Sequence, residues 1–267
     1  MAKTLTIRTA GPLQLSCLSD RCKRSDTPIQ RAAKRKASSE AQRRMNQIYS
    51  YQKLEMLLAC NFPTAGSALV IGLTYDDRHL PKYGNPTKDR KKVQSDLRSF
   101  LKRVRKARAE AGLPDVVAFW CIEVLTSKEG RWHVHLVLNN TGSDYDTIRR
   151  AWIYGHDIDI KPLRTDSEKN WETLARYMSK EARECQDEES RAGLNAWSHT
   201  RNILKPEVET VIVPDDYEIQ PPEGATVLLD EKRRTEFSSW HVIKVRYDGA
   251  QIGHGSPRPK RRKRQRR

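Results

Sequence analysis

The sequence predicts an α+β protein built on a ferredoxin-like, split βαβ antiparallel sheet with helices on one face, together with terminal extensions. The first observation is the order of the predicted elements between residues 68 and 185, which runs β-α-β-β-α-β-α. The second is a pair of almost unbroken apolar runs, 68–75 and 116–124, which are typical of strands buried in a sheet. The third is the short turn at 127–130, which joins the second run to another strand and favours an antiparallel hairpin.

Helices are indicated where apolar residues recur at helical spacing. Ser39 and Gln42 form a capping-box pair at the start of the first predicted helix, and Asn170 is the predicted cap of the last. The helix over 89–111 has an apolar stripe, and its other side carries Lys and Arg that predict a solvated, phosphate-tracking face over 98–108. The remaining predicted elements are helices at 39–59, 144–154 and 170–185 and strands at 130–139 and 156–162.

The patterning predicts one central domain with extensions, and the 267-residue chain is long enough to bury a core. We expect a basic N-terminal region with one helix over 1–62 and the central domain over 65–204. Short β-rich pieces between turns predict a strand-rich C-terminal extension over 205–250. Residues 251–267 form a polybasic tail predicted to stay disordered until it meets a polyanion, either as a nuclear-localisation cluster or as a generic DNA-binding tail.

Charge and cysteine content restrict the class of protein. The 50 Lys and Arg against 34 Asp and Glu give a formal charge of +16, which indicates a polyanionic partner such as nucleic acid. The five cysteines form no Cys-x-x-Cys pair, a pattern typical of reduced thiols in a cytosol. No apolar run reaches the roughly 20 residues of a membrane span, and no signal-peptide core is present. These features predict a soluble intracellular protein with no membrane partner.

The strand over 130–139 carries the first candidate functional residues. Successive side chains of a strand point to opposite faces, so His133 and His135 share one face. Two neutral imidazoles at this spacing can share a divalent cation. The alternative is a pair of half-exposed histidines on an ordinary strand. The opposite face is apolar and should pack on a core: Trp132, Val134, Leu136 and Leu138.

Glu123 lies within an otherwise apolar strand, where a lone carboxylate needs a cation, a metal or solvent. If the hairpin is in register, Glu123 faces the same side as His133 and His135, and the three form a site of two imidazoles and one carboxylate. Such a donor set suits Mg²⁺ or Mn²⁺ on a phosphate substrate, with zinc as an alternative metal. The alternative role for Glu123 is an ion pair with Arg or Lys across the sheet.

Tyr177 and Lys180 lie three residues apart in the last predicted helix and therefore share a helix face. Tyrosine can act as a covalent nucleophile, but its free pKa of about 10 means that it needs activation. A metal ion that polarises the phosphate and a nearby ammonium group can both provide this activation. The alternative is a tyrosine with its ring in the core beside a solvated lysine.

Taken in order, these motifs resemble those of the HUH endonucleases, in particular the rolling-circle replication initiators of plasmids, small viruses and filamentous phages. The apolar strand ending Leu73-Thr74-Tyr75 resembles the first motif of the family. His133-Val134-His135 is similar to its His-hydrophobic-His motif, and Tyr177-Met178-Ser179-Lys180 is similar to its Tyr-x-x-Lys motif. The resemblance spans roughly 40–205 and identifies the central domain as the expected HUH catalytic domain.

The resemblance implies that His133 and His135 bind Mg²⁺ or Mn²⁺, with Glu123 as third ligand and His156 as an alternative to it. It implies that Tyr177 attacks a phosphodiester of a single-stranded or supercoiled DNA origin and leaves a 5′-phosphotyrosine and a free 3′-OH. Lys180 would position or charge-balance the phosphate. A host helicase and polymerase are further implied partners, in the cytoplasm of a prokaryotic host.

The enzyme is expected to use a single tyrosine. Some relatives carry a second tyrosine four residues away, and here Thr173 and Glu181 occupy those positions. An HUH-type transposase or relaxase would perform the same chemistry, although relaxases commonly place the tyrosine before the histidines. A non-catalytic basic nucleic-acid-binding protein is the alternative from another class; such modules usually show stacking aromatics on exposed sheet positions.

Overall fold

The computed structural model describes residues 2–20, 40–125, 131–164, 170–180, 195–234 and 239–247. The chain divides into two compact units. Residues 28–205 form one, called here the central unit. Residues 1–27 together with 206–267 form the other, called here the terminal unit. The predicted turn at 127–130 and the polybasic tail at 251–267 lie outside the described residues.

The central unit contains a five-stranded antiparallel sheet with the strand order β6-β3-β5-β4-β7. The hairpin of the second and third predicted strands is confirmed, because β4 and β5 pair antiparallel along their length. The α+β class and the antiparallel pairing are therefore confirmed. The strands are β3 (Ala68–Thr74), β4 (Ala118–Leu125), β5 (Arg131–Asn139), β6 (Ile158–Pro162) and β7 (Ser198–His199).

One face of this sheet is covered by α2 and α3. Asn85 caps α2 by accepting a hydrogen bond from the backbone N–H of Lys88 at 3.1 Å, and Pro86 occupies the first turn, where a missing N–H costs nothing. The apolar stripe of α2 packs on the alternate residues of β3, β4 and β5 that include Ile71, Val134 and Leu136. The helices of the unit are α1 (Glu40–Asn61), α2 (Pro86–Glu110), α3 (Tyr145–Ala151) and α4 (Asn170–Lys180).

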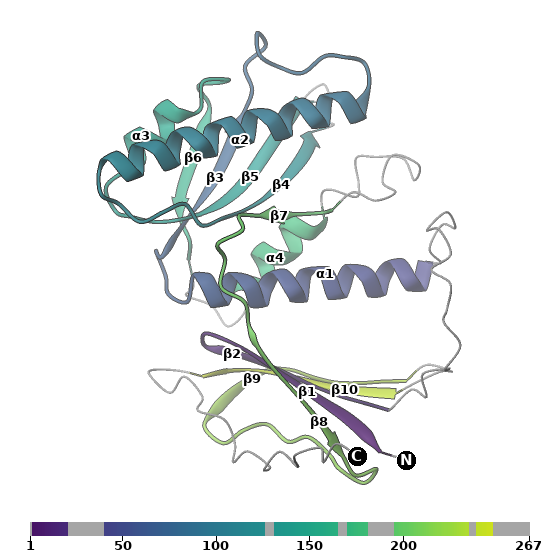
Figure 1. Ribbon diagram of the computed structural model, residues 1–267. Helices are drawn as coiled ribbons and strands as arrows, with labels where there is room; N and C mark the ends of the chain where they lie inside the picture. Colours follow the sequence, from purple (N-terminus) through teal and green to yellow (C-terminus); the bar gives the residue numbers. More distant parts are fainter. Residues whose placement is uncertain are drawn as a thin grey trace, which may run out of the picture. The chain divides into compact units, whose positions relative to one another are not determined.

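The opposite face carries α4 and the end of α1 (Figure 1). The ring of Phe62, just after α1, meets Phe119 of β4 edge to face with 5.8 Å between centroids. The indole of Trp171 in α4 donates to the carbonyl of Phe62 at 3.0 Å. Phe119 and Val137 make part of this face apolar, so it needs cover as well. The predicted one-sided arrangement therefore holds for α2 and α3 and is wrong for α4.

The terminal unit is a second five-stranded antiparallel sheet, ordered β8-β1-β2-β10-β9. We expected an N-terminal region and a separate C-terminal extension; the structure joins strands from both in one sheet. An isolated two-stranded hairpin is marginal in water, so β1 and β2 gain their stability from the later strands. The strands are β1 (Lys3–Ala10), β2 (Leu13–Asp20), β8 (Glu207–Val213), β9 (Ala225–Arg234) and β10 (Ser239–Tyr247).

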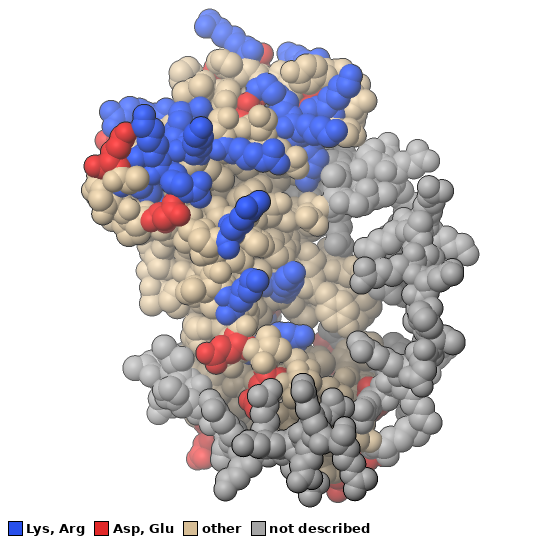
Figure 2. Space-filling view, in the orientation of Figure 1, with Lys and Arg blue, Asp and Glu red and all other residues tan. Residues whose placement is uncertain are grey.

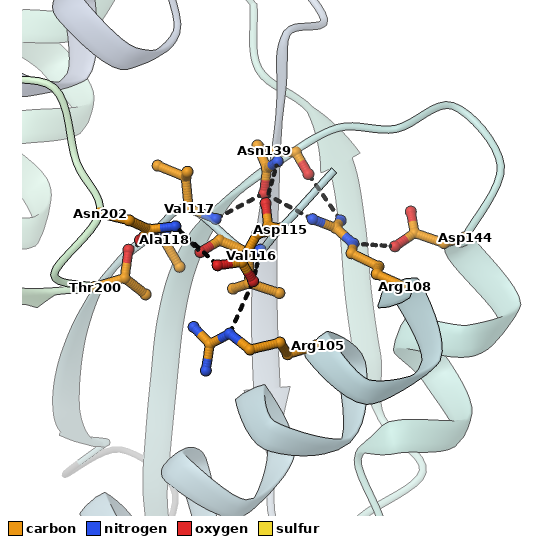
Figure 3. Close-up of polar contacts among 10 residues, drawn as sticks. All are labelled: Arg105, Arg108, Asp115, Val116, Val117, Ala118, Asn139, Asp144, Thr200 and Asn202. Carbon is orange, nitrogen blue, oxygen red and sulfur yellow. Dashed lines mark hydrogen bonds and ion pairs between the residues drawn. The ribbon is translucent and has the colours of Figure 1, made fainter. Parts of the chain in front are cut away.

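A buried polar cluster fixes the end of α2 against the sheet (Figure 3). The guanidinium of Arg108 donates to Asp144 at 2.6 Å and to the side-chain oxygen of Asn139 at 2.7 Å, and the side chains of Arg108 and Asp144 are 0% and 3% exposed. The Asn139 oxygen also accepts the backbone N–H of Val117 at 2.9 Å. The prediction that the basic run of α2 is solvated throughout is therefore wrong for Arg108.

The chain after α4 returns beside β4 and is held there by two side chains. Thr200 pairs with Ala118 through its backbone N–H at 2.9 Å and accepts the Ala118 N–H on its hydroxyl at 3.1 Å. The amide of Asn202 donates to the carbonyl of Val116 and to Asp115, each at 3.1 Å (Figure 3). This segment extends the sheet by β7. No helix among the described residues is long and apolar enough to cross a membrane.

Candidate functional site

The register of the sheet brings three of the predicted site residues to one face. Glu123 of β4 lies opposite His133 of β5, and His135 lies two residues further along the same strand. The alternate residues of β5 are buried in the core on the other face, as their spacing predicted. The arrangement follows from the two-residue period of strands in an antiparallel hairpin.

Glu123 contacts a histidine rather than a basic side chain. Its Oε2 lies 2.8 Å from Nε2 of His135, and the side chains of His135 and Glu123 are only 17% and 11% exposed. The rings of His133 and His135 lie side by side with 4.5 Å between centroids. In the described part of the chain, the alternative of an ion pair between Glu123 and Arg or Lys is not observed.

Tyr177 reaches the same face from α4. Its hydroxyl lies 2.7 Å from Nε2 of His135, and the two rings meet edge to face with 4.8 Å between centroids. Ala175 and Met178 are fully buried and anchor the helix, whereas Tyr177 remains 39% exposed. The tyrosine therefore lies beside the histidines with access to solvent. The side chain of Lys180 lies outside the described part of the structure.

Other residues of suitable chemistry lie elsewhere. His156, considered as an alternative metal ligand, is 99% exposed, and its Nε2 lies 4.0 Å from Asp76. Tyr75 is buried, and this burial, with the nearby Asp96 carboxylate, raises the pKa of its hydroxyl. Tyr154 packs against Tyr75 on the side of the sheet covered by α2. Neither of these tyrosines shares the histidine face.

Two residues of β3, Thr74 and Gly72, lie against His133, and neither was predicted to be a site residue. The hydroxyl of Thr74 lies 2.9 Å from Nδ1 of His133, and the other ring nitrogen, Nε2, lies beside Gly72 of the same strand as Thr74. A Cβ at Gly72 would lie 3.1 Å from that Nε2, so the absence of a side chain there makes room for the ring. Both residues lie on the histidine face by strand alternation, a signal that becomes visible only once the pairing of β3 with β5 is known.

Two polar groups lie within hydrogen-bond distance of the same nitrogen of His135. An imidazole nitrogen offers either one N–H or one lone pair, yet Nε2 of His135 faces both the Glu123 carboxylate and the Tyr177 hydroxyl. The side chains of His133, His135 and Glu123 are of the kinds that bind a divalent cation, through imidazole lone pairs and a carboxylate oxygen. As the side chains stand, no three His, Cys, Asp or Glu in the described ranges are already arranged as metal ligands.

We propose that His133 is a metal ligand and expect Gly72→Ala to lower Mn²⁺ affinity about 10-fold, because the added methyl group shifts the His133 ring from its position beside Thr74. Isothermal titration with Mn²⁺ measures this loss. Gly112→Ala is the control, because its added Cβ meets no atom within 4 Å and its effect is confined to stability. Unchanged Mn²⁺ affinity in Gly72→Ala would remove His133 from the ligand set.

Residues 68–182 match a family model described as replication-associated protein of the ORF2 type. This match supports a role for the protein as a replication initiator. The matched range runs from β3 to the end of α4, and no curated protein and no solved structure matches the chain. The matched range includes all of the candidate site residues: Glu123, His133, His135, Tyr177 and Lys180.

Proposed function

We propose that the protein is a metal-dependent HUH endonuclease that nicks and rejoins one DNA strand to initiate rolling-circle replication. The observation that carries the proposal is the Tyr177 hydroxyl, 2.7 Å from a histidine nitrogen on the face shared by His133 and Glu123. The match of residues 68–182 to a replication-associated family supports initiation over transposition as the biological role.

In the proposed reaction the Tyr177 oxygen attacks the phosphorus of a phosphodiester. An O–P bond forms to the tyrosine, the bond from phosphorus to the 3′ oxygen breaks, and the phenol proton is lost as the leaving oxygen gains one. The products are a 5′-phosphotyrosine and a free 3′-OH. Attack of a 3′-OH on the phosphotyrosine is the reverse reaction and rejoins the strand without another energy source.

The other site residues would bind the metal and balance the charge of the phosphate. His133, His135 and Glu123 would hold Mg²⁺ or Mn²⁺, which supplies charge to polarise the phosphate. Lys180 lies one helical turn beyond Tyr177 and would charge-balance the phosphate. The hydroxyl of Tyr177 is held beside His135 and open to solvent, so a DNA strand can approach it without rearrangement of α4.

The proposed substrate is a single-stranded or supercoiled DNA origin. A formal charge of +16 and the Lys and Arg gathered over α2 favour phosphate binding (Figure 2). The free 3′-OH is a primer, so a host polymerase and helicase are the proposed partners, in the cytoplasm of a prokaryotic cell. The polybasic residues 251–267 would add sequence-independent phosphate contacts.

The test is formation of a covalent adduct. The full chain is incubated with a randomised single-stranded oligonucleotide library or supercoiled plasmid, with Mn²⁺ or with EDTA. We expect a denaturant-stable protein–DNA adduct that requires Mn²⁺, disappears with EDTA and maps to Tyr177 by peptide sequencing. Mapping to Tyr145 or Tyr154 would contradict the assigned nucleophile. Binding without cleavage in Mg²⁺, Mn²⁺ and Zn²⁺ would favour a non-catalytic DNA-binding protein.

A further inference from the structure

Two cavities lie along α2, on either side of Trp120. The first, of about 160 Å³, is lined by Arg90 and Gln94 of α2 and by residues 195–198. The second, of about 400 Å³, is lined by Arg98 and Arg105 of α2 and by residues 200–202. Trp120 lines both, and each lies between α2 and the segment around β7. We call the two cavities together the α2–β7 groove.

Arg90, a buried arginine in this groove, has no carboxylate partner among the described residues. Arg90 is only 6% exposed, and its Nη2 donates to the Asn195 carbonyl at 3.3 Å. Its Nε has no hydrogen-bond partner among the described residues, and Arg90 forms no ion pair with them. Burial lowers the pKa of this guanidinium, the sign of an unfavourable site for a charge. A bound anion would supply the missing acceptor.

The second cavity presents further arginines to solvent. Arg105 is paired with Asp115 at 2.8 Å (Figure 3). Arg98 and Arg201 are exposed, and neither forms an ion pair with any residue in the described part of the chain. From Arg90 to Arg105 the helix advances about 22 Å, at roughly 1.5 Å per residue. This length fits several consecutive phosphates of a nucleic acid strand rather than one mononucleotide.

Aromatic rings between these cations indicate which form of nucleic acid fits. Trp120 is half-buried and lies between the two cavities, and Trp197 lines the first. Single strands are held by cationic grooves in which bases stack on aromatic side chains. The bases of a duplex are already stacked on one another and cannot do so. The combination therefore favours a single strand.

The groove adjoins the candidate active site along β4. Its first cavity extends to Cys121 and Ile122, next to Glu123 in sequence. β7 pairs with Phe119 and Trp120 of β4, and in the described ranges the pairing on that edge ends there. A strand leaving the groove can therefore pass over this edge of β4 to the histidine face.

We propose that the α2–β7 groove binds the single-stranded DNA that flanks the cleaved phosphodiester, with bases on Trp120 and Trp197 and phosphates on Arg90, Arg98 and Arg201. The inference rests on the proposed function for the identity of the ligand as the strand to be nicked. Binding in the groove is itself independent of cleavage.

The test measures binding in the full chain carrying Tyr177→Phe, which excludes covalent capture. Fluorescence anisotropy compares a labelled single-stranded oligo(dT) of about 20 nucleotides with a duplex of the same length. We expect Arg98→Gln combined with Arg201→Gln to weaken single-strand binding about 10-fold and to reduce the slope of log affinity against log salt by about 1.4. Arg149→Gln combined with Arg150→Gln, at exposed α3 positions outside the groove, is the matched control and should change affinity less than about 2-fold.

A second measurement uses the unaltered groove. Oligonucleotides with 5-iodouracil are photo-crosslinked to the Tyr177→Phe protein, and the crosslinked peptides are mapped; we expect Trp120 and Trp197. Crosslinks only outside residues 86–125 and 195–204, parental affinity in the double variant, or equal weakening of duplex binding would each overturn the groove assignment. Absence of any adduct with the unsubstituted protein, while binding in the groove is intact, would instead refute the proposed nuclease.

Discussion

Tyr177→Phe is expected to lower the rate of covalent adduct formation by at least about 1,000-fold, because it removes the attacking oxygen. The substitution keeps the ring that meets His135 with 4.8 Å between centroids, and the residue is 39% exposed, so the fold should be unaffected. The rate is measured with single-stranded DNA and Mn²⁺ by counting denaturant-stable adduct over time. Anisotropy with the same DNA should show affinity close to that of the parent.

Tyr145→Phe is the matched control for this experiment. Tyr145 begins α3 and is 36% exposed, so it resembles Tyr177 in access to solvent but packs with the helices on the other side of the sheet. Its substitution should leave the rate of adduct formation within about 2-fold of the parent. An adduct that survives in Tyr177→Phe would show that another group is the nucleophile.

Asp144→Ala is expected to destabilise the protein by about 3–5 kcal/mol, because it leaves the buried guanidinium of Arg108 without its counter-charge. The pair is joined at 2.6 Å with side chains 0% and 3% exposed, and among the described residues Asn139 would remain as the acceptor for the guanidinium. Urea unfolding followed by circular dichroism measures the free energy difference. The loss of stability should appear in the unfolding transition of the central unit.

Glu110→Ala provides the comparison at the same helix end. The Lys106–Glu110 pair is 3.7 Å apart with side chains 78% and 65% exposed, so its removal should change the free energy of unfolding by less than about 0.5 kcal/mol. Replacing Arg108 by Met together with Asp144→Leu should restore much of the stability, since both charges are then removed. A cost below about 1 kcal/mol for Asp144→Ala would mean that water reaches Arg108.

Local patterns predicted the central sheet well. The alternation of β5 placed its apolar residues in the core and both histidines on the other face, and the short hairpin placed Glu123 beside them. Those inferences needed only the two-residue period of a strand and a nearby partner. The pairing of β1 and β2 with β8 and β10 joins distant parts of the chain, and no local pattern specifies it.

The residues that meet on the histidine face could be named from the sequence, but the residues that lie against them could not. Thr74 lies within a motif quoted from the sequence, but its bond to His133 depends on the register of β3 with β5. Arg90 and Arg108 belong to a basic run whose spacing resembles a solvated helix face. Their burial comes from the segment 195–202 and from Asn139 and Asp144, which only the tertiary fold brings near α2.

The strand order of the terminal unit has a consequence for the way the protein is made on the ribosome. β1 and β2 are synthesised before the central unit, yet each lies beside a strand encoded after that unit, β8 for one and β10 for the other. The early hairpin must therefore wait, without its neighbours, until β8 and β10 have been synthesised. The central unit, being one continuous stretch, has every one of its own strands available before β8 has been synthesised.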